Sequence, residues 1–292
     1  MSSEIACKFI CTLLVIWSNS REGYAQDFGY NGRLGPEYWG ERYSSCIGKH
    51  QSPIDISEHN VNLVNLEPLN FINFNVTPAN VTITNNGHTV MMKINNKEMP
   101  EMSGGPLKGT YRFVQLHFHW GENDNEGSEN TINNSSFPME LHLVFYKTLY
   151  DSVEEAMQNR DGLTVLSYLY QLSETNNTKY DSLLSVFPHV ENPGTTVSVP
   201  EPPALKSLLV DDCKQYFTYD GSLTTPPCSE VVTWIEFKNA IVLSHDQLNL
   251  FRELNTEEGK MTHNFRPTQP LYDRQIYYNV GDSINELGDE NA

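Results

Sequence analysis

Residues 115–121 read QLHFHWG and residues 140–144 read ELHLV, and these two stretches decide the fold and the chemistry of the chain. Alternate residues of a β-strand point to the same face. Gln115, His117 and His119 therefore share one face of the first stretch, and apolar side chains occupy the other. Glu140 and His142 likewise share one face of the second stretch. The alternation predicts two strands, and if they are neighbours their three histidines converge on one side of a sheet.

Three imidazoles on a rigid sheet are the ligand set of a catalytic zinc ion, which keeps a fourth position open for water. A single His-x-His pair on an amphipathic strand is more often structural, so the second histidine strand strengthens the interpretation. Gln115 and Glu140 each precede a histidine by two residues on the same face, where each could accept the free ring N–H. We therefore predict one Zn²⁺ per chain, bound by His117, His119 and His142.

The rest of the chain consists mainly of short alternating runs separated by turn residues, which is typical of β structure. The predicted strands cover residues 69–74, 81–85, 89–94, 111–120, 139–146, 215–219 and 231–237. Helical periodicity predicts helices over 161–174 and 244–254, each beginning with an N-cap residue. No repeat or linker divides the chain, so we predict one α+β, β-dominated domain over residues 26–280, with a large, mostly antiparallel sheet and a few short surface helices.

The composition excludes several classes of partner. The 292 residues include 19 Lys and Arg against 37 Asp and Glu, a formal net charge of -18. Such a surface repels phosphate backbones, so we expect no nucleic-acid partner, and it argues against docking on anionic lipid. Hydrophobic residues make up 38% of the chain, enough for a core, which excludes wholesale disorder.

The N-terminal residues predict secretion. Residues 9–17 are almost all apolar, Lys8 precedes them, and Gly23-Tyr24-Ala25 offers a cleavage site, so residues 1–25 read as a signal peptide. The apolar run is too short for a bilayer, which needs about 20 residues; a buried N-terminal helix is the alternative. The C-terminus has no hydrophobic tail, so we expect no membrane anchor, and residues 281–292 read as an acidic, solvated tail.

Three cysteines remain after residue 25, namely Cys46, Cys213 and Cys228. In an oxidising compartment they allow one bridge and one spare thiol, and counting alone does not choose among the three pairings. Asparagines that begin N-x-Ser/Thr triplets are candidate glycosylation sites that fit an extracellular protein: Asn75, Asn80, Asn133, Asn134 and Asn176.

At this point the sequence resembles a known family. The two histidine stretches are similar to the zinc strands of the alpha-class carbonic anhydrases, and further blocks occur in the expected order over nearly all of the chain after residue 25: GPEYW (35–39), QSPIDI (51–56), NGH (86–88), GSE (127–129), GSLTTPP (221–227) and NFRP (264–267). The resemblance implies a ten-stranded twisted sheet with a conical cavity. It also implies a zinc lyase, a carbonate dehydratase that reversibly hydrates carbon dioxide to bicarbonate and a proton through zinc-bound hydroxide, for pH and carbon dioxide balance outside the cell.

By position, the resemblance also implies residue roles. Thr224 would accept a hydrogen bond from the zinc-bound hydroxide, and Glu129 would accept the hydrogen bond that the Thr224 hydroxyl donates. His88 would carry protons at the cavity mouth, and the backbone carbonyl of Asn264 would support His119. Tyr30 and Asn86 would order water, and the carbon dioxide pocket would be lined by Val144, Val165, Leu223, Thr225 and Trp234.

The cysteine pairing implied by the resemblance is Cys46 with Cys228, which leaves Cys213 free; an oligomer linked through Cys213 is conceivable but not predicted. The chain departs from the vertebrate pattern at Asn130, where a histidine is usual, and at Met91, where a polar residue is common. An extracellular binding or matrix protein with the same fold is the competing interpretation, but the intact ligand set favours the enzyme. A zinc peptidase is disfavoured because the chain has no His-Glu-x-x-His motif.

Overall fold

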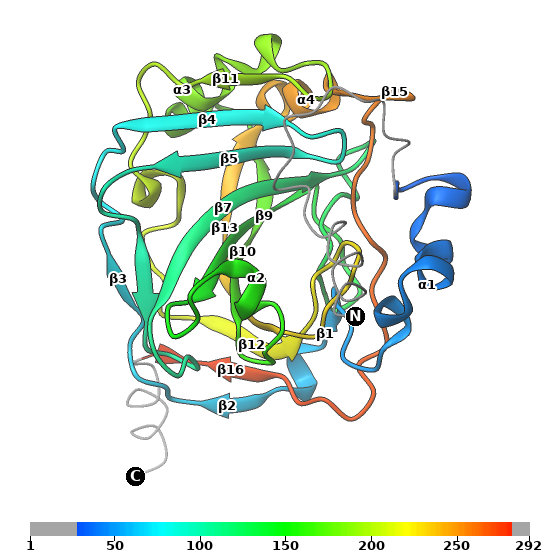
Figure 1. Ribbon diagram of the computed structural model, residues 1–292, viewed down its shortest axis with the longest axis vertical. Coiled ribbons are helices and arrows are strands. Elements are labelled where there is room, and N and C mark those ends of the chain that lie inside the picture. Colours follow the sequence, from blue (N-terminus) through cyan, green and yellow to red (C-terminus); the bar gives the residue numbers. More distant parts are fainter. Residues whose placement is uncertain (1–27, 282–292) are drawn as a thin grey trace, which may run out of the picture.

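The computed structural model describes residues 28–281, and one twisted sheet of twelve strands runs through this part of the chain (Figure 1). Its strands are β2 (Asn62–Val64), β3 (Asn70–Ile72), β4 (Asn80–Asn85), β5 (Val90–Asn95), β6 (Glu101–Ser103), β7 (Tyr111–Trp120), β9 (Met139–Lys147), β10 (Leu163–Ser173), β11 (Thr196–Ser198), β12 (Tyr216–Gly221), β13 (Val232–Ser244) and β16 (Tyr277–Asn279). Two small sheets pair β1 (Asp55–Ile56) with β8 (Thr131–Ile132) and β14 (Asn255–Thr256) with β15 (Gly259–Lys260).

The large sheet is mostly antiparallel. Its main hydrogen-bonded path follows the order β11-β4-β5-β7-β9-β10-β13-β12-β16-β2, and β3 and β6 pair beside it. Among its described strands, the parallel pairs are β10 with β13 and β16 with β2. The predicted fold class and all seven predicted strands are confirmed, and the sheet has twelve strands rather than ten because β3 and β6 extend it beside the main path.

The described helices are short. The α-helices are α1 (Trp39–Arg42), α2 (Val153–Ala156), α3 (Asp181–Leu184) and α4 (His245–Arg252). Single 3₁₀ turns cover Gly32–Leu34, Pro36–Tyr38, Ser44–Ile47, Glu58–Asn60, Thr178–Tyr180, Phe187–His189 and Leu205–Leu208. The helix predicted over 244–254 is confirmed as α4, which begins after Ser244. The Ser244 side chain and that of Gln247 form a capping box, which satisfies N–H groups that the first turn leaves free.

The helix predicted over 161–174 is wrong, because these residues form the strand β10. Its first eight residues are all buried, and it lies between β9 and β13 in the middle of the sheet. A strand covered on both faces loses its alternation and cannot be told from a buried helix by periodicity alone. The β-branched Thr164 and Val165 and the aromatic Tyr168 and Tyr170 were the signal that favoured a strand.

The two faces of β7 and β9 are used differently. Leu116, Phe118 and Trp120 of β7 and Leu141 and Leu143 of β9 enter the main hydrophobic core. The opposite face carries the histidines. A second cluster, built around residues of β9, β10 and β13, lies on that face. The histidines therefore stand on a platform fixed from behind by close packing, which limits how far they can shift.

The implied disulfide is confirmed between Cys46 and Cys228, and Cys213 is a free, half-buried thiol. The bridge spans a sequence separation of 182 residues and ties the segment that follows α1 to the loop that contains Thr224. The buried Arg266 reinforces the same junction, because its guanidinium donates to the carbonyl oxygens of Cys46 and Ser52, each at 2.9 Å.

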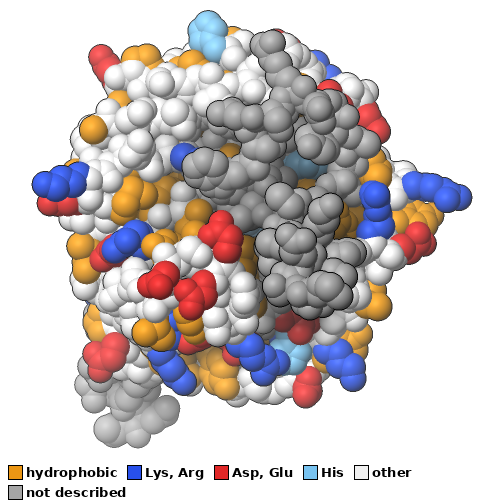
Figure 2. All heavy atoms as spheres, in the orientation of Figure 1, with side chains coloured by type: hydrophobic (Ala, Val, Ile, Leu, Met, Phe, Trp, Pro, Cys, Tyr) orange, Lys and Arg blue, Asp and Glu red, His pale blue; other side chains and the backbone are white. Residues whose placement is uncertain are grey.

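The predicted signal peptide (residues 1–25) lies outside the described residues, as does the predicted tail apart from Gly281. Within residues 28–281, no helix combines the length and the apolar character needed to cross a membrane. The five asparagines of the N-x-Ser/Thr triplets are all exposed, as glycosylation requires, and glycosylation stays a prediction. Acidic and basic side chains are interspersed on the face of the molecule that Figure 2 shows.

Candidate metal centre

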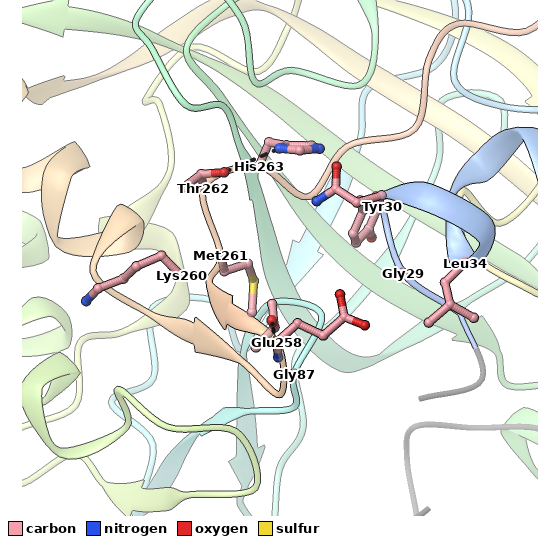
Figure 3. Close-up of a pocket in the computed structure, with 11 residues that line it drawn as sticks. Gly29, Tyr30, Leu34, Gly87, Glu258, Lys260, Met261, Thr262 and His263 are labelled. Atoms are coloured by element: carbon pink, nitrogen blue, oxygen red, sulfur yellow. Dashed lines mark hydrogen bonds between the residues drawn. The ribbon is translucent and has the colours of Figure 1, made fainter. Parts of the chain in front are cut away.

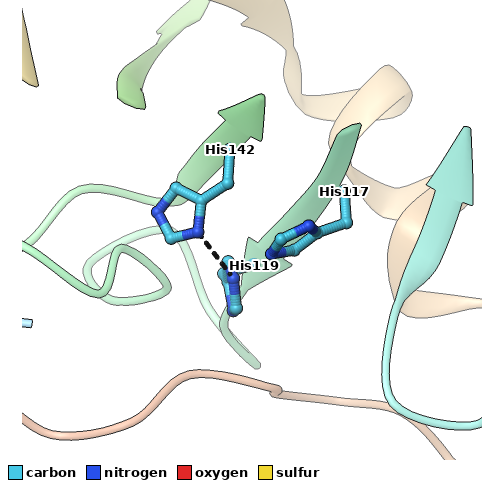
Figure 4. Close-up of side chains that lie close together, drawn as sticks. All are labelled: His117, His119 and His142. Atoms are coloured by element: carbon cyan, nitrogen blue, oxygen red, sulfur yellow. Dashed lines mark hydrogen bonds between the residues drawn. The ribbon is translucent and has the colours of Figure 1, made fainter. Parts of the chain in front are cut away.

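The three histidines converge from two adjacent strands. His117 lies opposite His142 in the antiparallel pairing of β7 with β9, and His119 follows His117 on the same face. One ring nitrogen of each residue lies within 4.8 Å of the corresponding nitrogens of the other two, and Figure 4 shows the rings directed toward one another. The spacing matches that of nitrogen ligands sharing one ion, so the predicted histidines are brought together.

The other nitrogen of each ring contacts an oxygen acceptor. Gln115 Oε1 lies 2.9 Å from His117 Nδ1, the Asn264 carbonyl oxygen 2.8 Å from His119 Nδ1, and Glu140 Oε1 2.7 Å from His142 Nε2. An acceptor at that position fixes the N–H on the outer nitrogen and leaves the inner nitrogen with its lone pair. The donor set therefore consists of Nε2 of His117, Nε2 of His119 and Nδ1 of His142.

Burial favours the neutral form of these ligands. Removal from water lowers the pKa of His117 well below its ordinary value, and the neighbouring imidazoles add to the effect. The same causes lower the pKa of His119 to about 3. Neutral imidazole is the form that binds a metal, so the cluster is ready to bind a divalent ion at neutral pH without first losing a proton. The residues present fit a zinc ion.

Glu140 is the most heavily bonded carboxylate of the site. Besides His142, it accepts hydrogen bonds from the backbone N–H groups of Glu129 and Asn130, from Asn130 Nδ2 and from Ser167 Oγ, at 2.6–2.8 Å. Burial alone would raise the pKa of Glu140, but His142, the Ser167 hydroxyl and His119 bring it below the ordinary value. Glu140 is therefore held as a buried anion, a strong acceptor for the His142 ring.

Glu129 faces the ligand nitrogens. Its Oε1 accepts from the Arg266 backbone N–H at 2.8 Å, and its Oε2 lies 3.4 Å from His119 Nε2 and 3.9 Å from His142 Nδ1. Burial and the charge of Glu140 raise the pKa of Glu129 well above its ordinary value, and the Thr224 hydroxyl opposes that rise. Oε2 has no partner of normal hydrogen-bond geometry, so Thr224 comes near the carboxylate without a well-formed bond.

An apolar row lies beside the ligands. Val144 of β9, Val165 of β10 and Trp234 of β13 are register neighbours, two residues along their strands from His142, Ser167 and Glu236. The Trp234 ring meets the His142 ring edge to face, with centroids 4.8 Å apart. Leu223 packs against the same cluster, and Thr224 and Thr225 precede the bridged Cys228. Val144, Val165 and Trp234 therefore lie beside the ligand row, and Leu223 joins their cluster.

His88 sits in a different environment. Its ring stacks on Phe28, with centroids 3.8 Å apart and planes within 6°. Burial lowers the pKa of His88 from its ordinary value to about 4. The side-chain oxygen of Asn86 accepts from the backbone N–H groups of His88 and Thr89, so Asn86 shapes the turn that carries His88. Burial and Glu129 raise the pKa of Tyr30 well above its ordinary value, which keeps its hydroxyl protonated.

A small cavity adjoins this turn. It has a volume of about 170 Å³ and is lined in part by Tyr30, Gly87, Met261 and His263 (Figure 3). None of the three clustered histidines lines it. The cavity therefore belongs to the surroundings of His88 and not to the metal centre.

The sequence reasoning missed three buried polar residues near the centre, namely Ser167, Glu236 and Arg266. Ser167 lies in the segment that we read as a helix. Glu236 gave a signal, because the alternation of residues 231–237 puts this acid on the same buried face as Trp234. Met91 lies opposite His117 in the pairing of β5 with β7 and is buried.

The chain is similar to known carbonic anhydrases. The family described as eukaryotic-type carbonic anhydrase matches residues 34–280. Putative carbonic anhydrase 3 of Caenorhabditis elegans is 39% identical over 249 residues, which cover 84% of this chain and 94% of that protein. Two proteins of Mus musculus are also similar. Carbonic anhydrase 6 is 36% identical over 268 residues (87% and 81% of the two chains), and carbonic anhydrase 15 is 34% identical over 257 residues (84% and 79%).

Proposed function

Because the chain belongs to the eukaryotic-type carbonic anhydrase family and is therefore a carbonate dehydratase, we propose that it hydrates carbon dioxide at a zinc ion held by His117, His119 and His142. The observation that carries the proposal is the convergence of three imidazole nitrogens whose rings are each fixed by an acceptor. When bound, zinc supplies a Lewis acid that brings the pKa of a coordinated water to about 7 and a positive charge that favours ionised Glu129.

Glu129 and Thr224 orient the reacting water. The ionised Glu129 carboxylate accepts a hydrogen bond from the Thr224 hydroxyl. Because the only hydrogen of that hydroxyl is then used, the threonine oxygen can only accept a hydrogen bond from the water. The water then turns a lone pair toward the carbon atom of carbon dioxide. The Arg266 backbone N–H holds the other oxygen of Glu129 and keeps the carboxylate in place.

Carbon dioxide is small and apolar, and it needs an apolar surface next to the ligands. Val144, Val165 and Trp234 form such a surface because they lie in one row across β9, β10 and β13, beside the histidine row. We assign Leu223 to the same wall and Thr225 to its edge. Exclusion of bulk water there favours the substrate over solvent.

Each cycle releases a proton, and we assign its removal to His88. A ring with a pKa of about 4 takes up few protons at neutral pH, so we expect His88 to act after its ring leaves the Phe28 stack. In water the ring would return toward its ordinary pKa of about 6.5, which suits transfer in either direction. Tyr30 and Asn86 remain our candidates for ordering the intervening water.

We further propose that the protein acts outside the cell. Support comes from the signal peptide predicted over residues 1–25, from the Cys46–Cys228 disulfide and from the five exposed asparagines of the candidate glycosylation triplets. Disulfides of this kind persist in oxidising compartments.

Stopped-flow measurement of carbon dioxide hydration tests the proposed reaction. The purified protein should lose its activity when a chelator strips the metal and regain it with one equivalent of zinc. Full activity in the stripped protein, or no activity after zinc is restored, contradicts the proposal.

A further inference from the structure

The row of polar side chains that includes two of the metal ligands continues across the sheet. His117, His142, Ser167 and Glu236 are successive register partners on β7, β9, β10 and β13. The last of them, Glu236, is fully buried and is not explained by the mechanism above. A buried acid costs free energy unless its proton or its hydrogen bonds compensate, so its presence calls for a physical account.

Asn130 joins Glu236 to Glu140. Its Nδ2 donates to Glu140 Oε1 at 2.8 Å and to Glu236 Oε2 at 3.2 Å. Its Oδ1 accepts from the Ile54 backbone N–H at 3.2 Å and from the Tyr219 hydroxyl at 3.0 Å. All four hydrogen-bonding positions of the amide are therefore used. A flipped amide would set its oxygen against the two acids and its nitrogen against the Ile54 N–H, so the orientation is unambiguous.

The two glutamates are not equivalent. Glu140 accepts five hydrogen bonds, including the one from His142. Glu236 accepts one well-formed bond, from Asn130; the Ser167 hydroxyl also lies near it, and Glu236 Oε1 has no partner of normal geometry. Two negative charges that share one amide nitrogen in a dry core repel strongly. The acid that accepts more hydrogen bonds, Glu140, therefore keeps its charge. Burial and the charge of Glu140 raise the pKa of Glu236 well above its ordinary value, in agreement with the bonding.

We propose that Glu236 is a positioning residue of the metal centre: as the neutral acid, it accepts one N–H of Asn130 and so fixes the other on Glu140, which orients His142. The pathway has four contacts, from Glu236 to Asn130, to Glu140, to the His142 ring and from there to the ion. The neutral form is essential, because an ionised Glu236 would repel Glu140 and compete with it for Asn130. The inference rests on the proposed zinc site.

Zinc dissociation into excess dipicolinate, measured on the zinc-loaded protein, tests this pathway. Groups that support a metal ligand typically change metal affinity 10–100-fold. We expect Asn130→Ala and Glu236→Met each to speed zinc loss by about 10-fold, and Glu236→Gln, a neutral residue of the same length, to stay within about 2-fold of the parent. Thr164→Val is the control, because this buried hydroxyl donates to the Thr233 carbonyl and contacts none of the acids.

A double-mutant cycle separates positioning from general loosening of the sheet. If Glu236 acts through Asn130, the double variant Asn130→Ala/Glu236→Met should lose zinc no faster than either single variant. Multiplied effects, about 100-fold in total, would overturn the proposal, and so would a Glu236→Gln variant as impaired as Glu236→Met. A parent protein that binds no zinc would instead overturn the proposed function, and this inference with it.

Infrared spectroscopy gives a second test that does not depend on the folding of Glu236→Met. The zinc-loaded parent at neutral pH should show the carbonyl stretching band of a protonated carboxylic acid, and Glu236→Gln should lack that band. If the two proteins have the same absorption in the protonated-carboxyl region, Glu236 is ionised and the proposal is contradicted.

Discussion

The histidine cluster and the His88 turn use the same side chain in opposite ways. The cluster stands on β7 and β9, its rings are held by Gln115, Glu140 and the Asn264 carbonyl, and its rear face is packed core. His88 lies on a turn, and its ring stacks on Phe28. Groups that must not move are fixed by directional hydrogen bonds on strands. The histidine to which we assign proton transfer lies instead on a turn, with its ring stacked on an aromatic ring.

Replacement of a ligand should have the largest effect. His119→Ala removes a nitrogen ligand and leaves the Asn264 carbonyl without its partner, so we expect loss of zinc and a fall of hydration activity by several orders of magnitude. His189→Ala, at an exposed histidine on a 3₁₀ turn, is the control and should keep both zinc and activity. Metal analysis and stopped-flow hydration measure the two properties. A zinc-bound, active His119→Ala variant would refute the assigned ligand set.

The Glu129–Thr224 pair should have the next largest effect, because it orients the reacting water without binding the ion. Thr224→Ala should lower kcat/KM by about 100-fold, a typical loss for one preorganised hydrogen-bonding group at a reaction centre. Thr224→Ser keeps the hydroxyl and should retain most of the activity. Zinc content should be unchanged in both variants. If Thr224→Ala is as active as the parent, the pair does not orient the water.

Loss of the Cys46–Cys228 disulfide should destabilise the loop that contains Thr224. Cys46→Ser opens a closed loop with a sequence separation of 182 residues, and the chain-entropy model puts the loss of unfolding free energy at about 5 kcal/mol, less any strain in the bridge. Urea denaturation measures this loss, and Cys213→Ser is the control at the free thiol. Stability of Cys46→Ser equal to that of the control would mean that packing around Arg266 alone holds the loop.

His88 should affect the rate only when buffer is scarce. His88→Ala should lower kcat in weak buffer by at least about 10-fold, a smaller effect than a positioned acid–base group usually has. The value of kcat/KM for carbon dioxide should stay nearly unchanged. Added imidazole should restore much of the rate, because a diffusing base can replace the side chain. An unchanged kcat in weak buffer would show that protons leave by another route.

Phe28 should have the smallest effect and tests the stack itself. Phe28→Ala removes the ring that covers His88, so the pKa of His88 should rise from about 4 toward the ordinary value of about 6.5. The direction follows because burial disfavours the charged ring, and exposure returns it to water. Histidine NMR titration of the two proteins measures the shift. If the pKa stays near 4, contacts of His88 other than the Phe28 ring keep it buried.

The alternation of residues 115–121 and 140–144 was enough to predict the strands, the convergent rings and two of the three acceptors, because period two fixes which side chains share a face. The alternation could not predict that the Asn264 carbonyl accepts from His119, because the two positions are 145 residues apart in the sequence. The role of Asn264 came from family resemblance. The strand β10 was misread because burial on both faces removed its alternation, and Ser167 was lost with it. The burial that lowers the pKa of His88 comes from tertiary contacts such as the Phe28 stack, which no local pattern encodes.

The central claim is that the cluster on β7 and β9 binds zinc, and anomalous X-ray scattering from crystals of the purified protein tests it most directly. The anomalous difference map from data collected on the two sides of the zinc absorption edge should show one strong peak per chain. That peak should lie within bonding distance of Nε2 of His117, Nε2 of His119 and Nδ1 of His142. The absence of a peak in zinc-loaded crystals, or a peak bound by other side chains, would contradict the account.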